Sequence, residues 1–260
     1  MNGAVDISVY KLILAYGILL LPIFWLYYYK TGLIKEVIIA TIRMAVQLSI
    51  VAFYFSYIFT LNNPWVNILW VFIMIIVSVF TTIKRSNLKI SLFIFPLFTA
   101  LSLSLLLIDT FFLGFIINLE NVFDARYFIP ISGMILGNSM NHNIVGLNAY
   151  FDKLKNNNQL YYFILVNKND HKKAILPYMR DAIKKALNPM IASMSVIGLI
   201  SLPGMMTGQM LGGSDPTTAV RYQILIMLAI FVSSNLNLVL TLIFSNRFIF
   251  DKFGKLKSEI

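Results

Sequence analysis

The C-terminal half of the chain is divided by a short stretch that reads Pro203-Gly204-Met205-Met206-Thr207-Gly208-Gln209. Two uncharged apolar segments, Met190–Leu202 and Tyr222–Phe244, lie on either side of it. A helix needs about 20 such residues to cross a ~30 Å hydrocarbon core, so the first segment spans only if it continues across this stretch. Backbone groups freed by a break inside a membrane are tolerated only where protein or a water-filled cavity satisfies them. The stretch is therefore a candidate for a translocation pathway, with Pro203, Gly204 and Gly208 as hinge residues. An ordinary kinked helix packed against its neighbours is the alternative.

The composition is that of a membrane protein. Of the 260 residues, 58% are hydrophobic and only 12% are charged, whereas about 25% are charged in soluble proteins. Long apolar runs predict an all-α, polytopic bundle of transmembrane helices. The absence of cysteine excludes disulfides and thiolate metal sites.

About seven membrane spans are predicted from the apolar runs. They cover Val9–Tyr29, Val37–Phe59, Trp65–Ile83, Leu92–Phe112, Phe128–Ala149, Pro189–Met210 and Tyr222–Phe244. Of the 21 lysines and arginines, 17 follow the odd-numbered spans. The positive-inside rule then places the N-terminus outside and the C-terminus in the cytoplasm of a plasma or inner membrane. Because the basic residues belong to membrane loops, no nucleic-acid partner is expected.

A single transmembrane domain over residues 1–260 is predicted, with a cytoplasmic segment over residues 152–187. Within that segment, Asp170–Leu187 has the apolar stripe of an amphipathic helix, and Asp170 is suited to cap it. Such a helix lies on anionic lipid or docks a cytoplasmic partner. Its direct continuation into the sixth span favours docking, and Asp181 is expected to pair with Lys185. The coupling candidates are Asp170, Lys172, Lys173, Arg180 and Asp181.

Polar side chains within two other spans are further candidates for a pathway. Arg43 and Gln47 are four residues apart, so they share one face of the second span. An arginine at the bilayer centre costs roughly 2.5 to 3.5 kcal/mol and usually faces protein or water. The alternative is that Arg43 lies near the cytoplasmic interface and extends its charge to the headgroups.

The fifth span carries Asn138, Asn141 and His142 on a polar stripe, with Asn138 and His142 four residues apart. This stripe either lines a path or joins helices by hydrogen bonds. Gly133 and Gly137 have the spacing that lets two helices approach closely.

Methionines and asparagines offer only weak metal ligands, so a metal site is left unassigned. Met205 and Met206 lie in the dividing stretch, where thioethers would suit a soft cation such as Cu(I). Methionine also fills irregular packing, which is the alternative. No cofactor is expected. The chain is not predicted to be an enzyme, because Gly137-Asn138-Ser139 is an incomplete nucleophile elbow and the chain has no phosphate-binding loop.

Several of these motifs resemble the iron-export ABC-transporter permeases, the FetB-like family with plant aluminium-tolerance relatives. The resemblance rests on Ser201–Gln209, Asp215-Pro216 and Ala219–Ile224. It extends to Arg43 with Gln47, to Gly133–Met140, and to Arg180–Leu187, and so covers nearly the whole chain. Pro177 departs from the pattern and is expected to interrupt the amphipathic helix.

The resemblance implies a permease subunit that works with a separate cytoplasmic ATP-binding subunit, which hydrolyses ATP. We therefore expect the membrane subunit of an ABC-type exporter for iron or a related metal ion, acting as a homodimer in membrane lipid. The expected pathway residues are Arg43, Gln47, Asn138, Asn141, Met205, Met206 and Gln209. The alternatives are another cargo, such as a nucleotide sugar, or a non-transporting scaffold in metal stress.

Overall fold

The computed structural model of the chain describes residues 7–251 and 254–257, and these residues are helical with no named strand. A 3₁₀ turn at Gly17–Leu19 joins the first two helices, and a π-helical segment, η2, at Thr110–Ile116 extends the fifth. The α-helices are α1 (Val9–Tyr16), α2 (Leu20–Tyr28), α3 (Ile34–Leu61), α4 (Pro64–Arg85), α5 (Ile90–Asp109), α6 (Ala125–Asn156), α7 (Asn158–Lys168), α8 (His171–Val196), α9 (Gly204–Leu211) and α10 (Pro216–Ile249).

The prediction of a polytopic helical membrane protein is confirmed. Among the described residues, 5 helical segments are long and apolar enough to cross a membrane. They are Val9–Tyr28, Ile34–Leu61, Pro64–Arg85, Ile90–Ile116 and Pro216–Ile249. The other two predicted spans correspond to α6, which is long but carries many polar residues, and to the discontinuous pair α8 and α9.

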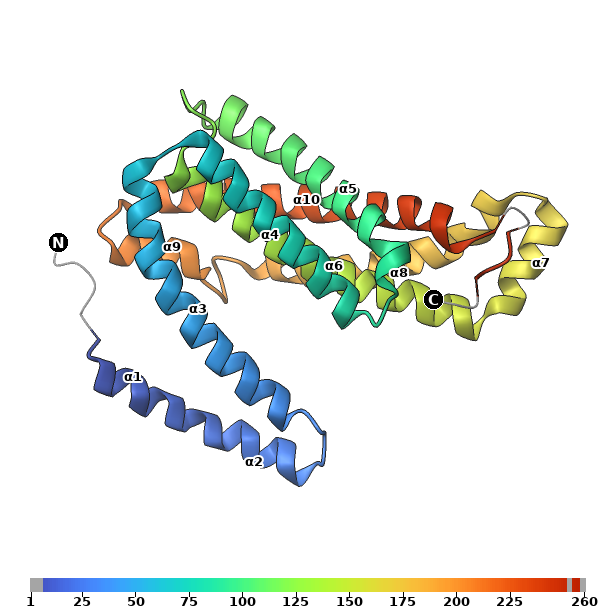
Figure 1. The fold of residues 1–260 in the computed structure, drawn as a ribbon, viewed down its shortest axis with the longest axis horizontal. Coiled ribbons are helices and arrows are strands. Elements are labelled where there is room, and N and C mark those ends of the chain that lie inside the picture. Colours follow the sequence, from blue (N-terminus) through green and yellow to red (C-terminus); the bar gives the residue numbers. More distant parts are fainter. Residues whose placement is uncertain (1–6, 252–253, 258–260) are drawn as a thin grey trace.

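The core of the bundle is built by α4, α5, α6 and α10, which run along the long axis of the molecule (Figure 1). Helix α10 packs against α5 and α6, and α4 packs against both of these. Helices α6 and α10 approach closely at Gly146 of α6, where a Cβ would lie 2.5 Å from Cδ1 of Leu238 on α10. Of the two glycines predicted to allow such an approach, Gly133 contacts α4, since a Cβ there would lie 3.0 Å from Cε of Met74, whereas a Cβ on Gly137 would meet nothing within 4 Å.

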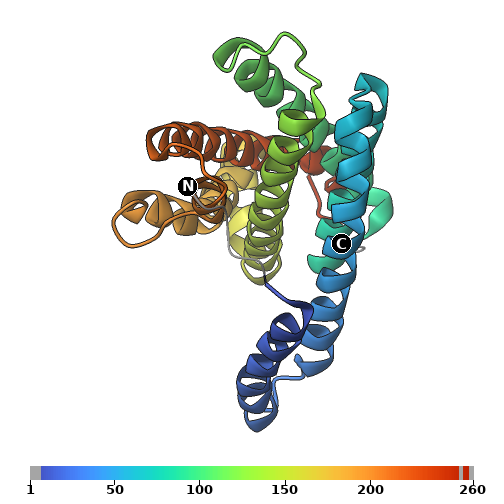
Figure 2. The same cartoon turned by 90° about the vertical axis from the view of Figure 1, so that its left-hand side faces the viewer.

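Helices α1 and α2 and the first part of α3 stand apart from this bundle, as Figures 1 and 2 show, whereas the end of α3 packs on it, with Tyr54 against Trp70 of α4. Their side chains are almost all exposed, and only Ile58 of α3 is buried. Their composition is nevertheless as apolar as that of the buried helices. Lipid or another protein must therefore cover these faces, because exposing them to water is unfavourable.

The charge pattern assigned alternate loops to the same side of the membrane. In the structure, residues at or next to two such loops meet at each end of the bundle. At the expected outer end, Asn62 donates to Asp124 Oδ2 at 3.1 Å and accepts from the amide of Ala125 at 2.9 Å. At the opposite end, Arg85 pairs with Glu36 at 3.0 Å. The orientation of the chain in the membrane stays a prediction.

The break in the predicted sixth span occurs earlier than expected. Helix α8 is continuous through Pro177 and Pro189, so the predicted interruption at Pro177 is wrong. The helix ends at Val196, and a tight turn follows in which Gly198 has φ +84° and donates to the carbonyl of Ser201 at 2.9 Å. Pro203 then caps α9. The left-handed conformation that Gly198 adopts without a Cβ penalty explains why the break is at this glycine.

Candidate translocation cavity and coupling helix

A cavity of about 450 Å³ lies between α6, α8, α9 and α10, next to the break. Its soft side chains are the four methionines Met134, Met190, Met205 and Met227. Its polar side chains are Asn138, Asn141, His142, Ser193 and Gln223. Pro203 at the start of α9 completes this wall together with Pro189 of α8. The broken span and the polar stripe of the fifth predicted span therefore border the same space.

The cavity carries no carboxylate and no basic side chain apart from one imidazole. Asn138 Nδ2 donates to the carbonyl of Met134 at 2.8 Å, and His142 Nδ1 lies 2.6 Å from the carbonyl of Asn138. Asn138 and His142, which are four residues apart, thus interact through the backbone carbonyl of Asn138 and not through its side chain. Gln223 Oε1 is buried and has no hydrogen-bond partner among the described residues. Thioether sulfur, imidazole and amide oxygen are ligands for soft or borderline cations.

The structure brings some of the predicted pathway residues together and leaves others apart. Asn138, Asn141, Met205 and Pro203 all line the cavity. The remaining candidates on α9, which are Met206, Gly204, Gly208 and Gln209, lie in its helix beyond the lining. Gln209 Oε1 is nevertheless buried without a partner in the described chain.

Arg43 and Gln47 do not reach this cavity. Both are exposed on the first part of α3, which stands away from the bundle. Sequence reasoning placed them in the pathway because they share a helix face, but it had no means of showing that this part of α3 lies away from α6 and α10.

The other cavity residues were missed. Met190 and Met227 are isolated in the sequence, so no local pattern marks them, and Met134 and Gln223 lie in the family motifs Gly133–Met140 and Ala219–Ile224 without having been assigned a role. One available signal was Gln223, a polar residue near the start of an otherwise apolar segment, since polar residues inside membranes are often functional.

A column of buried polar side chains also runs through the core between α5, α6 and α10. Asn143 donates to Asn237 Oδ1 at 2.6 Å, and Asn237 donates to Ser104 Oγ at 3.2 Å. Tyr150 donates to Asn246 Oδ1 at 2.6 Å nearer the opposite end. The buried polar residues of α6 extend from Ser132 to Tyr150. These two residues are about 27 Å apart along the helix axis, close to the ~30 Å thickness of a hydrocarbon core.

The amphipathic helix predicted at Asp170–Leu187 forms the first part of α8. Asp170 caps it as predicted, accepting from the amides of Lys172 and Lys173 at 2.9 and 3.3 Å. These backbone hydrogen bonds, that from Lys173 foremost, lower the pKa of Asp170. Arg180 is exposed on the same helix.

Asp181 pairs with Lys153 of α6 and not with Lys185. The hydrogen bond from Lys153 lowers the pKa of the Asp181 carboxyl. The contact joins α8 to the end of α6, so the predicted coupling segment is fixed to the bundle. Sequence spacing favoured Lys185 because it considered one helix alone.

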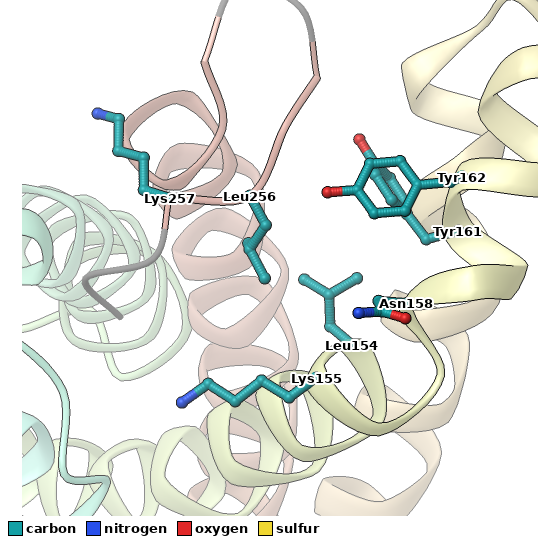
Figure 3. Close-up of a pocket in the computed structure, with 7 residues that line it drawn as sticks. All are labelled: Leu154, Lys155, Asn158, Tyr161, Tyr162, Leu256 and Lys257. Carbon is teal, nitrogen blue, oxygen red and sulfur yellow. The ribbon is translucent and has the colours of Figure 1, made fainter.

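The C-terminal segment is clamped onto α7 and α8. Tyr161 donates to the carbonyl of Gly254 at 2.6 Å, and His171 Nδ1 lies 2.9 Å from the Tyr161 hydroxyl. The Phe250 ring stacks on Tyr161 and meets the His171 ring edge to face. Figure 3 shows the adjoining pocket of about 250 Å³, in which the Leu256 side chain points toward Leu154 and the two tyrosines of α7 line the other side.

Acidification is expected to loosen this clamp through His171. Burial lowers the pKa of His171 while the C-terminal segment is bound to α7 and α8. When the segment detaches, His171 is exposed to water and binds a proton more readily. The clamp is therefore strongest above the unperturbed pKa of about 6.5 and weakens as the pH falls below it. Since the chain has 0 cysteines, a spin label on Lys257→Cys reports the mobility of this segment alone. Mobility should rise on acidification, and His171→Gln should remove that pH dependence.

Comparison with known proteins agrees with this architecture. A model of the Uncharacterised protein family (UPF0014) matches residues 9–250. The UPF0014 membrane protein YjkA of Bacillus subtilis is 35% identical over 89% of this chain and 91% of its own length. Protein ALUMINUM SENSITIVE 3 of Arabidopsis thaliana is 31% identical over 81% of the chain and 76% of its own length.

A third relative carries a functional name. The "Probable iron export permease protein FetB" of Escherichia coli is 29% identical over 81% of the chain and 80% of its own length. No solved structure matches the chain. The family match over most of the sequence confirms the resemblance drawn from the dividing stretch. The chain belongs to the UPF0014 family and is a multi-pass protein of the cell membrane.

Proposed function

We propose that this chain is the permease subunit of an ATP-driven exporter of iron or a related metal cation. The observation that carries the proposal is the cavity at the broken span, where four methionines, His142 and two asparagines meet. The name of the relative in Escherichia coli supports export of iron. The chain hydrolyses no ATP itself, and a separate cytoplasmic ATP-binding subunit supplies the energy.

A cavity without charged side chains suits the passage of a metal ion more than its storage. Exported ions must enter and leave, so a tight cage of carboxylates or thiolates would slow release. No group of 3 or more His, Cys, Asp or Glu that could hold a metal occurs in the described part of the chain. Thioether and amide ligands bind a soft or borderline cation weakly enough to let it go.

The ATP-binding subunit acts on the cavity through α8. The exposed residues Lys172, Lys173 and Arg180 present positive charge at the expected cytoplasmic end. The same helix continues to Met190 and Ser193 in the cavity wall and ends at the turn around Gly198. A displacement of the first turns of α8 is therefore transmitted to the cavity, and the turn allows α9 to move separately.

Two copies of the chain form the working transporter in our proposal. The exposed apolar faces of α1, α2 and α3 provide surface for a second copy and for lipid. Arg43 and Gln47 lie in this region, where they would face a partner permease or the lipid headgroups.

Metal efflux with a co-purified ATP-binding subunit tests the proposal. Cells that lack the gene should accumulate iron and lose it more slowly after loading than cells that carry it. Purified chain should copurify with the ATP-binding subunit and stimulate its ATP hydrolysis in lipid vesicles. Unchanged metal content and efflux, with no ATP-binding subunit bound, would remove the export function.

Reversing the charge at Asp181 is expected to uncouple ATP hydrolysis from transport. Asp181→Lys places a positive charge beside Lys153 and removes the ion pair that joins α8 to α6. Both groups are partly exposed, so we expect the fold itself to stay stable. The ratio of ions exported to ATP hydrolysed should fall in vesicles. The double variant Lys153→Glu/Asp181→Lys should restore it, and a double variant as poor as the single one would contradict coupling through this pair.

A further inference from the structure

A buried carboxyl group lies inside the bundle, away from the cavity and the coupling helix. Asp109 is 3% exposed and ends α5, where the chain enters the π-helical segment η2. The hydroxyl of Ser132 on α6 donates to Asp109 Oδ2 at 2.6 Å. Asp109 Oδ1 is buried without a hydrogen-bond partner in the described chain. Intramembrane acids of this kind are rare and usually functional, and π-helical turns are often found at functional sites.

No positive side chain balances this carboxyl. Helices α4, α6 and α10 and the segment η2 pack against α5. The positive groups of α6 and α10 at the same end are Arg126 and Arg221, and both are exposed; the other charged groups there are the acids Asp124 and Asp215 at the starts of these helices. The basic pair of α4 is at its opposite end. No ion pair of Asp109 is found among the described residues, although an unpaired charge inside a membrane is costly.

A proton fits this site better than a metal ion does. Calcium takes six to eight oxygen ligands and magnesium six. Asp109 offers one unpartnered oxygen, and the nearest polar group, Ser132, already uses its hydroxyl proton on the other oxygen. A proton needs only that one oxygen. Its addition to Oδ1 gives a neutral acid that still accepts the hydrogen bond from Ser132.

Further buried polar side chains lie along the core beyond Asp109. Ser104 lies five residues before Asp109 on the same helix, about 7.5 Å along its axis, and accepts from Asn237. Ser139, Ser233 and Ser234 are buried in the same region, and their hydroxyls have no partner among the described residues.

We propose that Asp109 binds an exchangeable proton on Oδ1, at one end of the polar column. The O–H bond forms with a proton delivered by water, and the carboxylate becomes a carboxylic acid with no other change in charge or oxidation state. On release, the proton returns to water, and Asp109 becomes an anion. The site is independent of the proposed cargo cavity, so it stands or falls separately from metal export.

Infrared spectroscopy of the purified chain in lipid tests this assignment. At neutral pH the exposed carboxyls are ionised, so a protonated Asp109 should give a distinct carboxylic C=O stretch. The band should shift in D₂O, because the proton exchanges, and it should be absent in Asp109→Asn. The matched control Asp215→Asn removes an exposed carboxyl that caps α10 and should leave the band unchanged.

Two further outcomes decide the assignment. Ser132→Ala removes the hydrogen bond to Oδ2 and should shift the band to higher frequency, and this variant serves where Asp109→Asn does not assemble. Absence of the band in the unmodified chain would overturn the proposal. A band that persists in Asp109→Asn, ignores D₂O or is unaffected by Ser132→Ala would overturn it as well.

Discussion

Gly146→Leu is expected to prevent the helix bundle from assembling. Even the first side-chain carbon would lie 2.5 Å from Cδ1 and 3.1 Å from Cδ2 of Leu238, and Leu238 is fully buried. Leu238 cannot move aside without displacing its neighbours, so α6 and α10 must separate. Adding methylenes to a well-packed core costs about 1–3 kcal/mol, and separation also breaks the hydrogen bond between Asn143 and Asn237.

Detergent-solubilised protein measures this effect by thermal unfolding and by size-exclusion chromatography. Gly146→Leu should elute as aggregate, and Gly146→Ala should unfold at a lower temperature than the unmodified chain. Gly137→Ala is the matched control on the same helix, because its Cβ meets nothing within 4 Å. Replacing glycine by alanine in an open helical position stabilises by about 0.5–1 kcal/mol. Equal thermal stability of the two alanine variants would contradict the proposed close contact.

The double variant Asn138→Leu/Asn141→Leu is expected to abolish most of the transport while leaving the fold intact. Both residues line the cavity, and Asn141 is exposed, so their replacement removes cation ligands without emptying the core. Each lost polar contact to a desolvated ion costs about 1–3 kcal/mol. Since about 1.4 kcal/mol corresponds to a tenfold change in binding, efflux should fall by about tenfold or more.

Efflux of loaded metal from vesicles that contain the permease and its ATP-binding subunit measures this loss. Asn235→Leu is the matched control, because Asn235 lies on α10 but does not line the cavity. It should transport at the normal rate. If the double variant also does so at equal protein level, the cation does not pass these asparagines.

Local sequence patterns predicted the features that depend on a single helix. The capping by Asp170, the amphipathic first part of α8 and the long apolar helices follow from spacing and composition. The existence of a break in the sixth span also followed, since the residues before Pro203 are too few to cross. Its position did not, because the sequence offers both Gly198 and Pro203, and no local pattern showed that the left-handed turn forms at Gly198.

Contacts between helices were beyond the reach of these patterns. Asp181 was assigned to Lys185 because the two are four residues apart, but Lys153 approaches from another helix. Gly133 and Gly137 have the spacing of a helix contact, but only Gly133 makes one, and the closer contact at Gly146 has no such pattern. Asp109 was passed over because a single acid in an apolar run has no local motif. Its importance comes from Ser132, which is 23 residues away in the sequence.

The hydrogen bonds of Asn62 determine the order in which parts of the protein can assemble during synthesis. Asn62 closes the turn between α3 and α4, but its partner Asp124 comes 62 residues later in the chain. At a synthesis rate of about 5–20 residues per second, the ribosome needs roughly 3 to 12 seconds to supply it. During that interval, the Asn62 side chain has only its neighbour Asn67 and water as hydrogen-bond partners. The tip of the α3–α4 hairpin is therefore tied to the start of α6 only after that segment has been made.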